Sequence, residues 1–241
     1  MNQAILILIL AATLSGSVRG AGDTPPAASK PLEKTLHFRV LVSPQGQVLT
    51  ATPLDAELSI AINRAALGLV KTLTIEPARD HGQAVQSRTG LTLDVRSEPQ
   101  PAGGYRLALK SAMLMPQASS RVAPVYPPKA VVAKASALLF MEYVVLADGT
   151  VDRKQMRVLQ ATMNTAAMRF RAELETATIA ALSQWRFEPD QVGDQTIATK
   201  TWAKVQFCLE SCSETAAPPP DILALPKSLN ADLTLAKVHA E

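Results

Sequence analysis

The sequence predicts an α+β protein made of two similar units, each a small antiparallel sheet of order strand, strand, helix, strand with the helix packed on one face. Three observations support this prediction. Segments that alternate apolar and polar residues, typical of half-buried strands, are interleaved with segments of helical periodicity. A helical segment is followed by Glu76-Pro77 and, later in the chain, another is followed by Glu188-Pro189. With 47% hydrophobic residues, the chain has enough apolar side chains for a packed core.

The first unit is expected at residues 36–110. Its first strand is predicted where Phe38, Val40 and Val42 alternate along the chain, which is the period of a half-buried strand. Its elements are predicted, in order, as strands at 36–42 and 47–52, a helix at 57–72, a strand at 85–95 and an extra strand at 105–109. Pro77 ends the helix, because the residue before a proline disfavours the helical conformation.

A linker at residues 111–121 is expected to lead into the second unit, at residues 122–212. Its elements are predicted as a short helix at 129–135, strands at 138–146 and 151–160, a helix at 171–184 and a final strand at 199–209. Asp148-Gly149 is a residue pair that tight hairpin turns prefer, so it predicts the turn between the first two strands.

The two units match at a regular offset. Pro77 and Pro189 are 112 residues apart, whereas Gly46 and Gly149 are 103 residues apart, so the difference in length falls in the loop before the helix. An offset that stays constant over the helix end and the last strand indicates an internal duplication.

The second helix and the last strand predict the core of the second unit. Leu174, Ala177, Ala181 and Trp185 are spaced by three or four residues and share one helical stripe. The core is therefore expected to contain Leu174, Trp185, Phe187, Val205 and Phe207. Trp202 falls on the polar face of the last strand, where it is either covered by the tail or available to a partner.

Residues 1–21 have the layout of a secretory signal peptide, because an apolar stretch at Ala4–Leu14 is followed by small residues at Gly20 and Ala21. A retained membrane anchor is the alternative, although Ala4–Val18 would form only about 22 Å of helix against about 30 Å of hydrocarbon. Either alternative implies export. The expected location is the periplasm, with attachment to the inner membrane as the alternative.

The segments outside the two units are expected to lack a core of their own. Residues 22–35 are rich in proline and alanine and predict a linker. Residues 213–241 predict a Pro-rich, loosely ordered tail. A short helix through Leu229, Leu233 and Lys237 is the alternative for its last part.

Cys208 and Cys212 are the two cysteines of the chain. An exported protein meets an oxidising compartment, which favours a disulfide between them. A continuous strand would hold them about 13 Å apart, so the bridge requires a turn after Cys208. Two free thiols are the alternative.

Composition and motifs exclude several classes of function. A net charge of +3 is well short of the concentrated positive charge of nucleic-acid-binding proteins, so nucleic acid is not an expected partner. His37, His81 and His239 are scattered, and none has a cysteine or carboxylate at metal-ligand spacing. The sequence has no nucleophile elbow, phosphate-binding loop or zinc motif. We therefore expect no enzyme activity, no metal and no cofactor.

A series of motifs in the second unit resembles a known family. In chain order they are Pro124-Val125-Tyr126-Pro127, Phe140–Val145 leading into Asp148-Gly149-Thr150-Val151, Trp185-Arg186-Phe187-Glu188-Pro189, Gly193 and Val205-Gln206-Phe207. This ordered set resembles the C-terminal domain of TonB-family energy transducers. The first unit looks like a diverged copy of the same domain, which keeps Gly46, Glu76-Pro77 and the last strand.

The resemblance implies binding by strand addition. Members of this family capture a short extended segment of outer-membrane transporters, and a sheet edge with unpaired N–H and C=O groups can accept such a segment. The expected edge is Lys200–Leu209. The residues expected to contact the partner are Tyr126, Pro127, Lys200, Trp202, Lys204 and Gln206; for Tyr126, packing in the core is the alternative.

The expected function is thus a periplasmic protein of the cell envelope that binds extended peptides and supports energy-coupled transport across the outer membrane. Its partner is an outer-membrane transporter or another envelope protein. One alternative is a complete transducer that keeps its leader as an anchor. Another is a structural or interaction protein whose two units pack together without binding a transporter, and a homodimer is left open.

Overall fold

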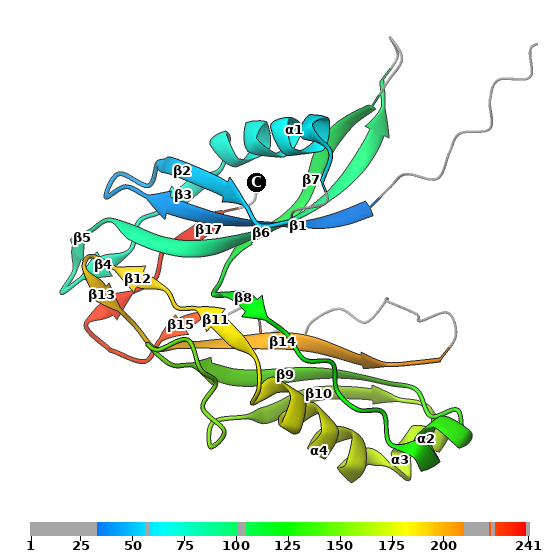
Figure 1. Cartoon of the computed structure of the whole chain (residues 1–241). Helices are drawn as coiled ribbons and strands as arrows, with labels where there is room; N and C mark the ends of the chain where they lie inside the picture. The colour runs from blue at the N-terminus through cyan, green and yellow to red at the C-terminus, as the bar shows by residue number, and fades with distance from the viewer. Residues whose placement is uncertain (1–32, 56–57, 101–104, 210–221, 223–224, 240–241) are drawn as a thin grey trace, which may run out of the picture. The chain divides into compact units, whose positions relative to one another are not determined.

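The protein has an α+β fold of antiparallel sheets with a few helices (Figure 1). The computed structural model describes residues 33–55, 58–100, 105–209, 222 and 225–239. The expected leader at residues 1–21 and the linker up to Leu32 lie outside the described residues. Among the residues that the structure does describe, no helix has the length and apolar character needed to cross a membrane.

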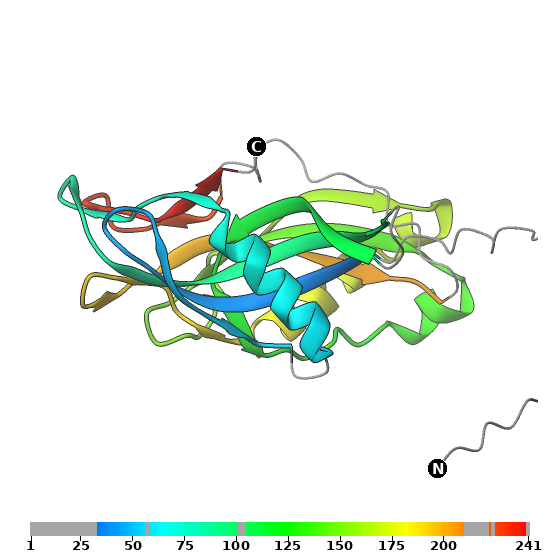
Figure 2. The ribbon, with the colours of Figure 1, turned by 90° about the horizontal axis from the view of Figure 1, so that it is seen from above.

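The first half contains one antiparallel sheet covered by a helix. Strands β1 (Glu33–Val42), β2 (Val48–Pro53) and β6 (Ser87–Pro99) pair in the order β2-β1-β6, and β7 (Tyr105–Leu114) pairs with the other edge of β6. Helix α1 (Ile60–Lys71) lies across one face of this sheet (Figures 1 and 2). It begins after Ser59, whose hydroxyl accepts a hydrogen bond from the Ile62 N–H at 3.3 Å.

The second half repeats this arrangement. Strands β9 (Ala137–Val145), β10 (Arg157–Met163) and β14 (Thr199–Phe207) pair in the order β10-β9-β14. The helices are α2 (Pro128–Val132), α3 (Thr165–Met168) and α4 (Arg171–Leu182). Strand β9 is buried at all of its residues because the sheet is covered on both faces.

Three short strands follow the main helix in each half. In the first half they are β3 (Thr74–Glu76), β4 (Arg79–Asp80) and β5 (Gln83–Ala84). In the second half they are β11 (Arg186–Glu188), β12 (Gln191–Val192) and β13 (Gln195–Thr196). The order of elements is therefore the same in both halves.

The likeness between the two halves extends to single backbone contacts. Gly46 and Gly149 have φ angles of 79° and 80°, which are unfavourable for any residue with a Cβ. A Cβ on Gly46 would lie 1.9 Å from the carbonyl oxygen of Ile75, and a Cβ on Gly149 would lie 2.2 Å from that of Phe187. Both glycines are thus required by the same close approach to the strand that follows the main helix.

The halves and the C-terminal tail are joined by three contacts of one kind. Strand β12 of the second half pairs with the start of β6 in the first half. In the tail, β15 (Lys227–Ser228) pairs with the start of β14, and β16 (Leu233–Thr234) pairs with β4. The second half thus contacts the first, the first contacts the tail, and the tail contacts the second, so the pairing closes a ring.

Equivalent hydrogen bonds mark these three contacts. Their donor and acceptor pairs are Gly193 N–H to Gln86 O at 2.8 Å, Leu229 N–H to Ala198 O at 3.0 Å, and His81 N–H to Asp232 O at 2.8 Å. The tail therefore takes the place that a third hairpin of this type would occupy. Both halves and the tail belong to one compact unit, from Leu32 to Glu241.

A second kind of strand pairing also occurs once in each half. Strand β8 (Gln117–Ser120) pairs with β11, placing Ala118 opposite Phe187. Strand β17 (Lys237–His239) pairs with β3 in the same direction and places Val238 opposite Ile75. The end of the chain therefore supplies to the first half the strand that the segment between the halves supplies to the second.

Each half has its own core. The first is built from the inner faces of β1 and β6, helix α1 and tail residues that include Leu233 and Leu235. The second lies between α4 and the inner face of β9 and β14, and it contains the five expected residues Leu174, Trp185, Phe187, Val205 and Phe207. Trp185 Nε1 donates a hydrogen bond to Val122 O at 2.8 Å, which satisfies its polar atom inside the core.

Two expected segments differ in the structure. Residues 111–121 do not form a linker, because β7 continues to Leu114 and β8 follows at Gln117–Ser120. The tail is not loosely ordered at 227–239, and Leu229, Leu233 and Lys237 do not share a helix. Both segments are strands because their backbone groups pair with β6, β11, β14, β4 and β3, which lie far away in the sequence.

Two boundaries in the second half also shift. The returning strand, expected at 151–160, runs from Arg157 to Met163. The Asp152 carboxylate accepts hydrogen bonds from the Lys154 N–H at 2.9 Å and from the Gln155 side chain at 3.0 Å, and this turn delays the strand. The short helix expected at 129–135 ends at Val132.

Candidate functional site

Strand β14 contains the expected binding edge. One side of β14 pairs with β9 along its whole length, from Thr199 to Phe207. The other side pairs with β15 at Thr199 and Lys200, and no other strand of the described residues pairs with it beyond that point. The expected edge at Lys200–Leu209 therefore begins later, because Lys200 is covered by the tail.

The backbone direction along this edge follows from the contact with the tail. Ala198 O accepts a hydrogen bond from Leu229, so Ala198 directs its backbone groups away from β9. Direction alternates along an antiparallel strand, and every second residue therefore points the same way. At Trp202 and Gln206 the N–H and C=O groups consequently point to the outer edge.

The first half shows what an added strand at this edge looks like. The equivalent edge of β6 pairs with β7, in a register that runs from Leu91 opposite Leu114 to Pro99 opposite Tyr105 (Figure 1). The offset of the duplication places Leu91 at the position of Ala203. The two halves thus differ in that one carries a resident strand at this edge.

Position 90 in the first half and position 202 in the second explain part of this difference. A Cβ on Gly90 would lie 2.0 Å from Gln117 Cγ and 2.5 Å from Met115 O, so the chain that follows β7 passes directly over this glycine. Trp202 is the equivalent residue in the second half. Because a side chain with a Cβ stands at this position, we expect an added strand to leave β14 before Trp202.

Trp202 itself is packed against the sheet rather than projecting from it. Its ring lies 5.9 Å from that of Phe140, and it joins a small apolar cluster with Leu138, Leu159 and the tail residue Ile222. The tail thus covers this side chain. Within the described part of the chain, Trp202 Nε1 is buried without a hydrogen-bond partner.

Tyr126 and Pro127 lie beside the far end of β14. The Tyr126 ring contacts Phe207 edge to face, with centroids 5.2 Å apart, and its hydroxyl donates a hydrogen bond to Ala135 O. Burial raises the pKa of Tyr126 above its usual value. Pro127 precedes the first residue of α2. Tyr126 therefore packs on the end of the strand and holds Phe207 in place.

The expected polar contacts are spread along β14. The Lys200 ammonium lies 3.7 Å from the Glu142 carboxylate, which also binds Arg157. Lys204 is exposed and has an interaction partner of its own, and Gln206 is half-buried. The structure thus brings Lys200 to a charged cluster, away from Tyr126 at the other end of the strand.

A buried carboxyl group, which sequence reasoning missed, connects the halves. Asp190 accepts hydrogen bonds from the Thr89 hydroxyl of β6 at 2.7 Å and from the Thr199 hydroxyl of β14 at 2.8 Å. Burial raises the pKa of Asp190 to about 6, against the effect of the two hydroxyl groups. The signal in the sequence was a polar residue where the other half has Ala78.

The first half lacks the counterpart of this carboxyl. Ala78 takes the place of Asp190, while Ser87 and Thr201 take the places of Thr199 and Thr89 by the same offset. Both of these hydroxyl groups are buried and have no hydrogen-bond partner in the described part of the chain. Ser87, the counterpart of Thr199, is therefore left without the acceptor that Asp190 provides in the second half.

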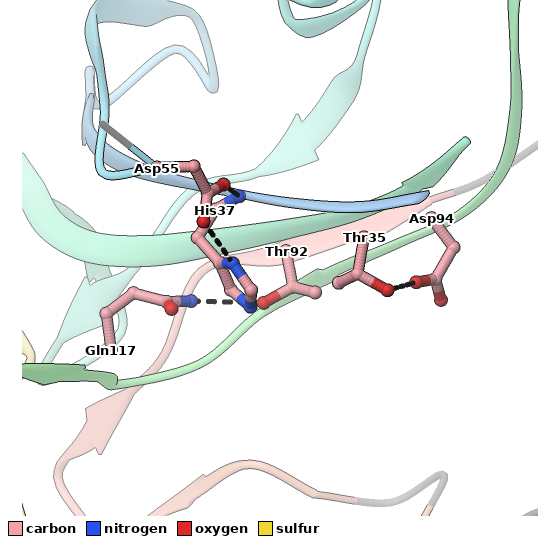
Figure 3. A network of polar contacts seen from close by, with 6 residues as sticks. All are labelled: Thr35, His37, Asp55, Thr92, Asp94 and Gln117. Atoms are coloured by element: carbon pink, nitrogen blue, oxygen red, sulfur yellow. Dashed lines mark hydrogen bonds and ion pairs between the residues drawn. The ribbon is translucent and has the colours of Figure 1, made fainter. Parts of the chain in front are cut away.

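His37 is held by a network on the first sheet (Figure 3). Its Nδ1 lies 3.1 Å from Asp55 Oδ1, and its backbone N–H donates to Asp55 Oδ2 at 2.7 Å. The Gln117 amide donates to the Thr92 hydroxyl at 3.0 Å, and Thr92 lies opposite His37 across β1 and β6. Sequence spacing missed this pair because Asp55 comes from the segment after β2.

The remaining side chains do not form a metal centre among the described residues, where no group of three or more His, Cys, Asp or Glu could hold an ion. Cys208 is disulfide-bonded, and Cys212 lies outside the described residues.

No protein-family model matches the chain, and no curated protein matches its sequence.

Proposed function

We propose that this chain is a periplasmic, TonB-like protein of the cell envelope that binds extended peptide segments by strand addition to β14. One observation carries the proposal. In the first half, β7 occupies the outer edge of β6, whereas no described strand occupies the equivalent edge of β14 beyond Lys200. The ordered motifs from Pro124 to Phe207 add support, because they resemble a domain that captures peptides in this way.

The internal strand defines the expected geometry of the bound peptide. Strand β7 runs antiparallel to β6, so a peptide in the same place would run antiparallel to β14. Its chain would pair with Ala203–Phe207 and leave the sheet before Trp202. Backbone hydrogen bonds would supply affinity, and the side chains beside the edge would select the sequence. An outer-membrane transporter with an exposed N-terminal segment is the partner that this function implies, and support of energy-coupled transport is its expected role.

The test compares two variants at one position. In Gln206→Pro the outward backbone N–H is removed, while an edge strand tolerates the proline; in Gln206→Ala the N–H is kept. Synthetic peptides with the N-terminal segments of outer-membrane transporters are titrated against the whole chain. We expect the proline variant to bind about tenfold more weakly, which corresponds to one lost hydrogen bond, and the alanine variant to bind almost as the wild type.

Hydrogen exchange identifies the site of binding. A bound peptide is expected to slow exchange of the amide at Gln206 and to leave the amides of Trp202 and of β7 unchanged. Equal loss of affinity in both variants, or no binding by any peptide, would contradict strand addition.

A structural protein is the second candidate, and one observation favours it. The first sheet contains strands of both halves, in the order β13-β12-β6-β1-β2, so the halves already bind each other by strand pairing. In this case the β14 edge needs no external partner. Amides at Trp202 and Gln206 that exchange slowly in the free protein would favour this candidate over peptide binding.

A further inference from the structure

A cavity of about 350 Å³ lies between strands β1 and β6 of the first half and strands β11 and β12 of the second half. We call it the Arg39 cavity. Its lining includes Arg39 and Arg88 from the first half and Phe187, Glu188 and Gln191 from the second. Its volume falls within the range of about 300 to 1,000 Å³ that is usual for binding sites of small ligands.

The two arginines lie on the same face of the first sheet. Arg39 on β1 is directly opposite Gly90 on β6. Arg88 comes two residues before Gly90, so Arg39 and Arg88 are diagonal neighbours on adjacent strands. Diagonal neighbours lie about 7 to 8 Å apart, which is within the reach of long side chains. One ligand can therefore contact both guanidinium groups.

The described lining of this cavity has an excess of one positive charge, because it contains two arginines and one carboxylate. Both Nε and a terminal nitrogen of Arg39 donate hydrogen bonds to the two oxygens of Glu188. The Arg88 side chain is exposed and forms no ion pair within the described part of the chain. A guanidinium group has a planar fork of N–H donors that matches a carboxylate. Arg88 is therefore available to a carboxylate from outside the chain.

The rest of the lining suits a peptide bond beside that carboxylate. The side-chain amide of Gln191 can both donate and accept hydrogen bonds. Figure 3 shows Gln117 directed at Thr92, to whose hydroxyl its amide nitrogen donates at 3.0 Å, and the carbonyl oxygen of Gln117 remains an acceptor. Phe187 and Pro189 also belong to the lining and add apolar carbon atoms to it.

We propose that the Arg39 cavity binds the C-terminal carboxylate of a peptide, with Arg88 as its main cationic contact and Gln117 and Gln191 beside the last peptide bond. The pairing of Glu188 with Arg39 shows that this lining accepts a carboxylate. A carboxylate adds a single negative charge, which matches the excess charge of the lining. This site goes beyond strand addition, since its contacts are side chains on the face of the first sheet rather than backbone groups at the edge of β14.

The test is an NMR titration of the whole chain with N-acetyl-dialanine, whose carboxylate is free. N-acetyl-dialanine amide is the uncharged control, and inorganic phosphate is a second anion. We expect the free acid to shift the amide signals of Arg88 and Gln191 until they saturate, and added salt to weaken its binding because the arginines are exposed to solvent. The uncharged control should leave both signals unchanged.

Substitutions of the two charges have opposite expected effects. Arg88→Gln should weaken binding of the free acid about tenfold, which corresponds to the loss of one charge-assisted pair. Glu188→Gln should strengthen it about threefold, because it removes the carboxylate that competes for Arg39. Lys200→Gln, at the equivalent position of the second half, is the matched control and should leave the affinity unchanged.

Four results would overturn the proposal. They are unchanged affinity in Arg88→Gln, weaker binding by Glu188→Gln, equal shifts with the free acid and its amide, and phosphate binding tighter than the free acid. Loss of peptide addition at β14 changes none of these outcomes, because Ala203–Phe207 do not line the Arg39 cavity. The two proposals therefore fail separately.

Discussion

The two halves share one backbone plan but are completed in different ways. In the first half, β7 covers the outer edge of β6 and β17 completes β3. In the second half, β8 completes β11, and beyond Lys200 the outer edge of β14 has no strand partner among the described residues. The difference teaches that the two halves share the contacts that form each of them, while the segments outside the shared elements decide which edges stay open.

The largest loss of stability is expected at the glycines that both halves share. In Gly149→Val, the new Cβ would lie 2.2 Å from Phe187 O at a residue with φ of 80°. We expect a loss of about 3 kcal/mol or more in the free energy of unfolding, measured with urea. Gly46→Val should behave alike, because its Cβ meets Ile75 O.

Gly82 supplies the control for this prediction. It has a φ of 80°, but a Cβ there has open space around it. Gly82→Val therefore includes the conformational cost and not the collision. A Gly149 variant that is no less stable than the Gly82 variant would show that the close approach is unimportant.

The second prediction concerns Asp190, where the halves differ by one carboxyl group. Its pKa of about 6 is higher than the ordinary value of 3.8, so the folded state binds this proton more tightly than the unfolded state. The stabilisation is complete below about pH 4 and is lost as the pH rises through about 6. Between these limits the wild type should lose about 3 kcal/mol relative to Asp190→Asn.

Unfolding of both proteins at a series of pH values measures this difference. Other carboxyl groups titrate in both proteins, so only the difference between the two curves reports on Asp190. Parallel curves from pH 4 to pH 7 would show that Asp190 titrates normally.

The third prediction tests whether the tail stabilises the first half alone. Leu235 is 7% exposed and packs in the core of the first half. Leu235→Ala should cost about 2 kcal/mol through the lost apolar contacts and the cavity left behind. Hydrogen exchange should quicken in β3, which the tail completes, and not in β11. Equal effects on both strands would mean that the tail supports the whole molecule rather than the first half.

The smallest effect is expected at two equivalent threonines. The Thr89 hydroxyl donates to Asp190, whereas the Thr201 hydroxyl is buried without a partner in the described part of the chain. Thr89→Val should therefore destabilise the protein by about 1 kcal/mol or more, and Thr201→Val should be neutral or stabilising. Thermal unfolding of the pair checks the sign, and a larger loss for Thr201→Val would contradict the argument.

Local signals in the sequence predicted the elements that the halves share. The Asp148-Gly149 turn, the Glu-Pro ends and the apolar stripe of α4 depend on neighbouring residues, and they predicted the α+β class and the core around Trp185. Strands β8, β15, β16 and β17 gave no such signal, because they are two to four residues long and form only where a distant strand offers an edge.

The candidate site was also predicted only in part. Alternation placed Trp202 on the outer face of the correct strand, but its cover by Ile222 depends on the path of the tail. Asp190 and the pair of His37 with Asp55 were missed because their partners come from other elements. Side chains that join distant elements are determined by the tertiary fold, and one sequence does not reveal them.

The pairing of β17 with β3 also determines the order in which a growing chain can finish its fold. Val238 is synthesised roughly 160 residues after Ile75, which takes about 10 to 30 s at ordinary rates of translation. During that time β3 has no native strand beside it. Strand β8, in contrast, is synthesised before β11, so β11 can pair with it as soon as it has been made. The half that is synthesised first is therefore the last to be completed.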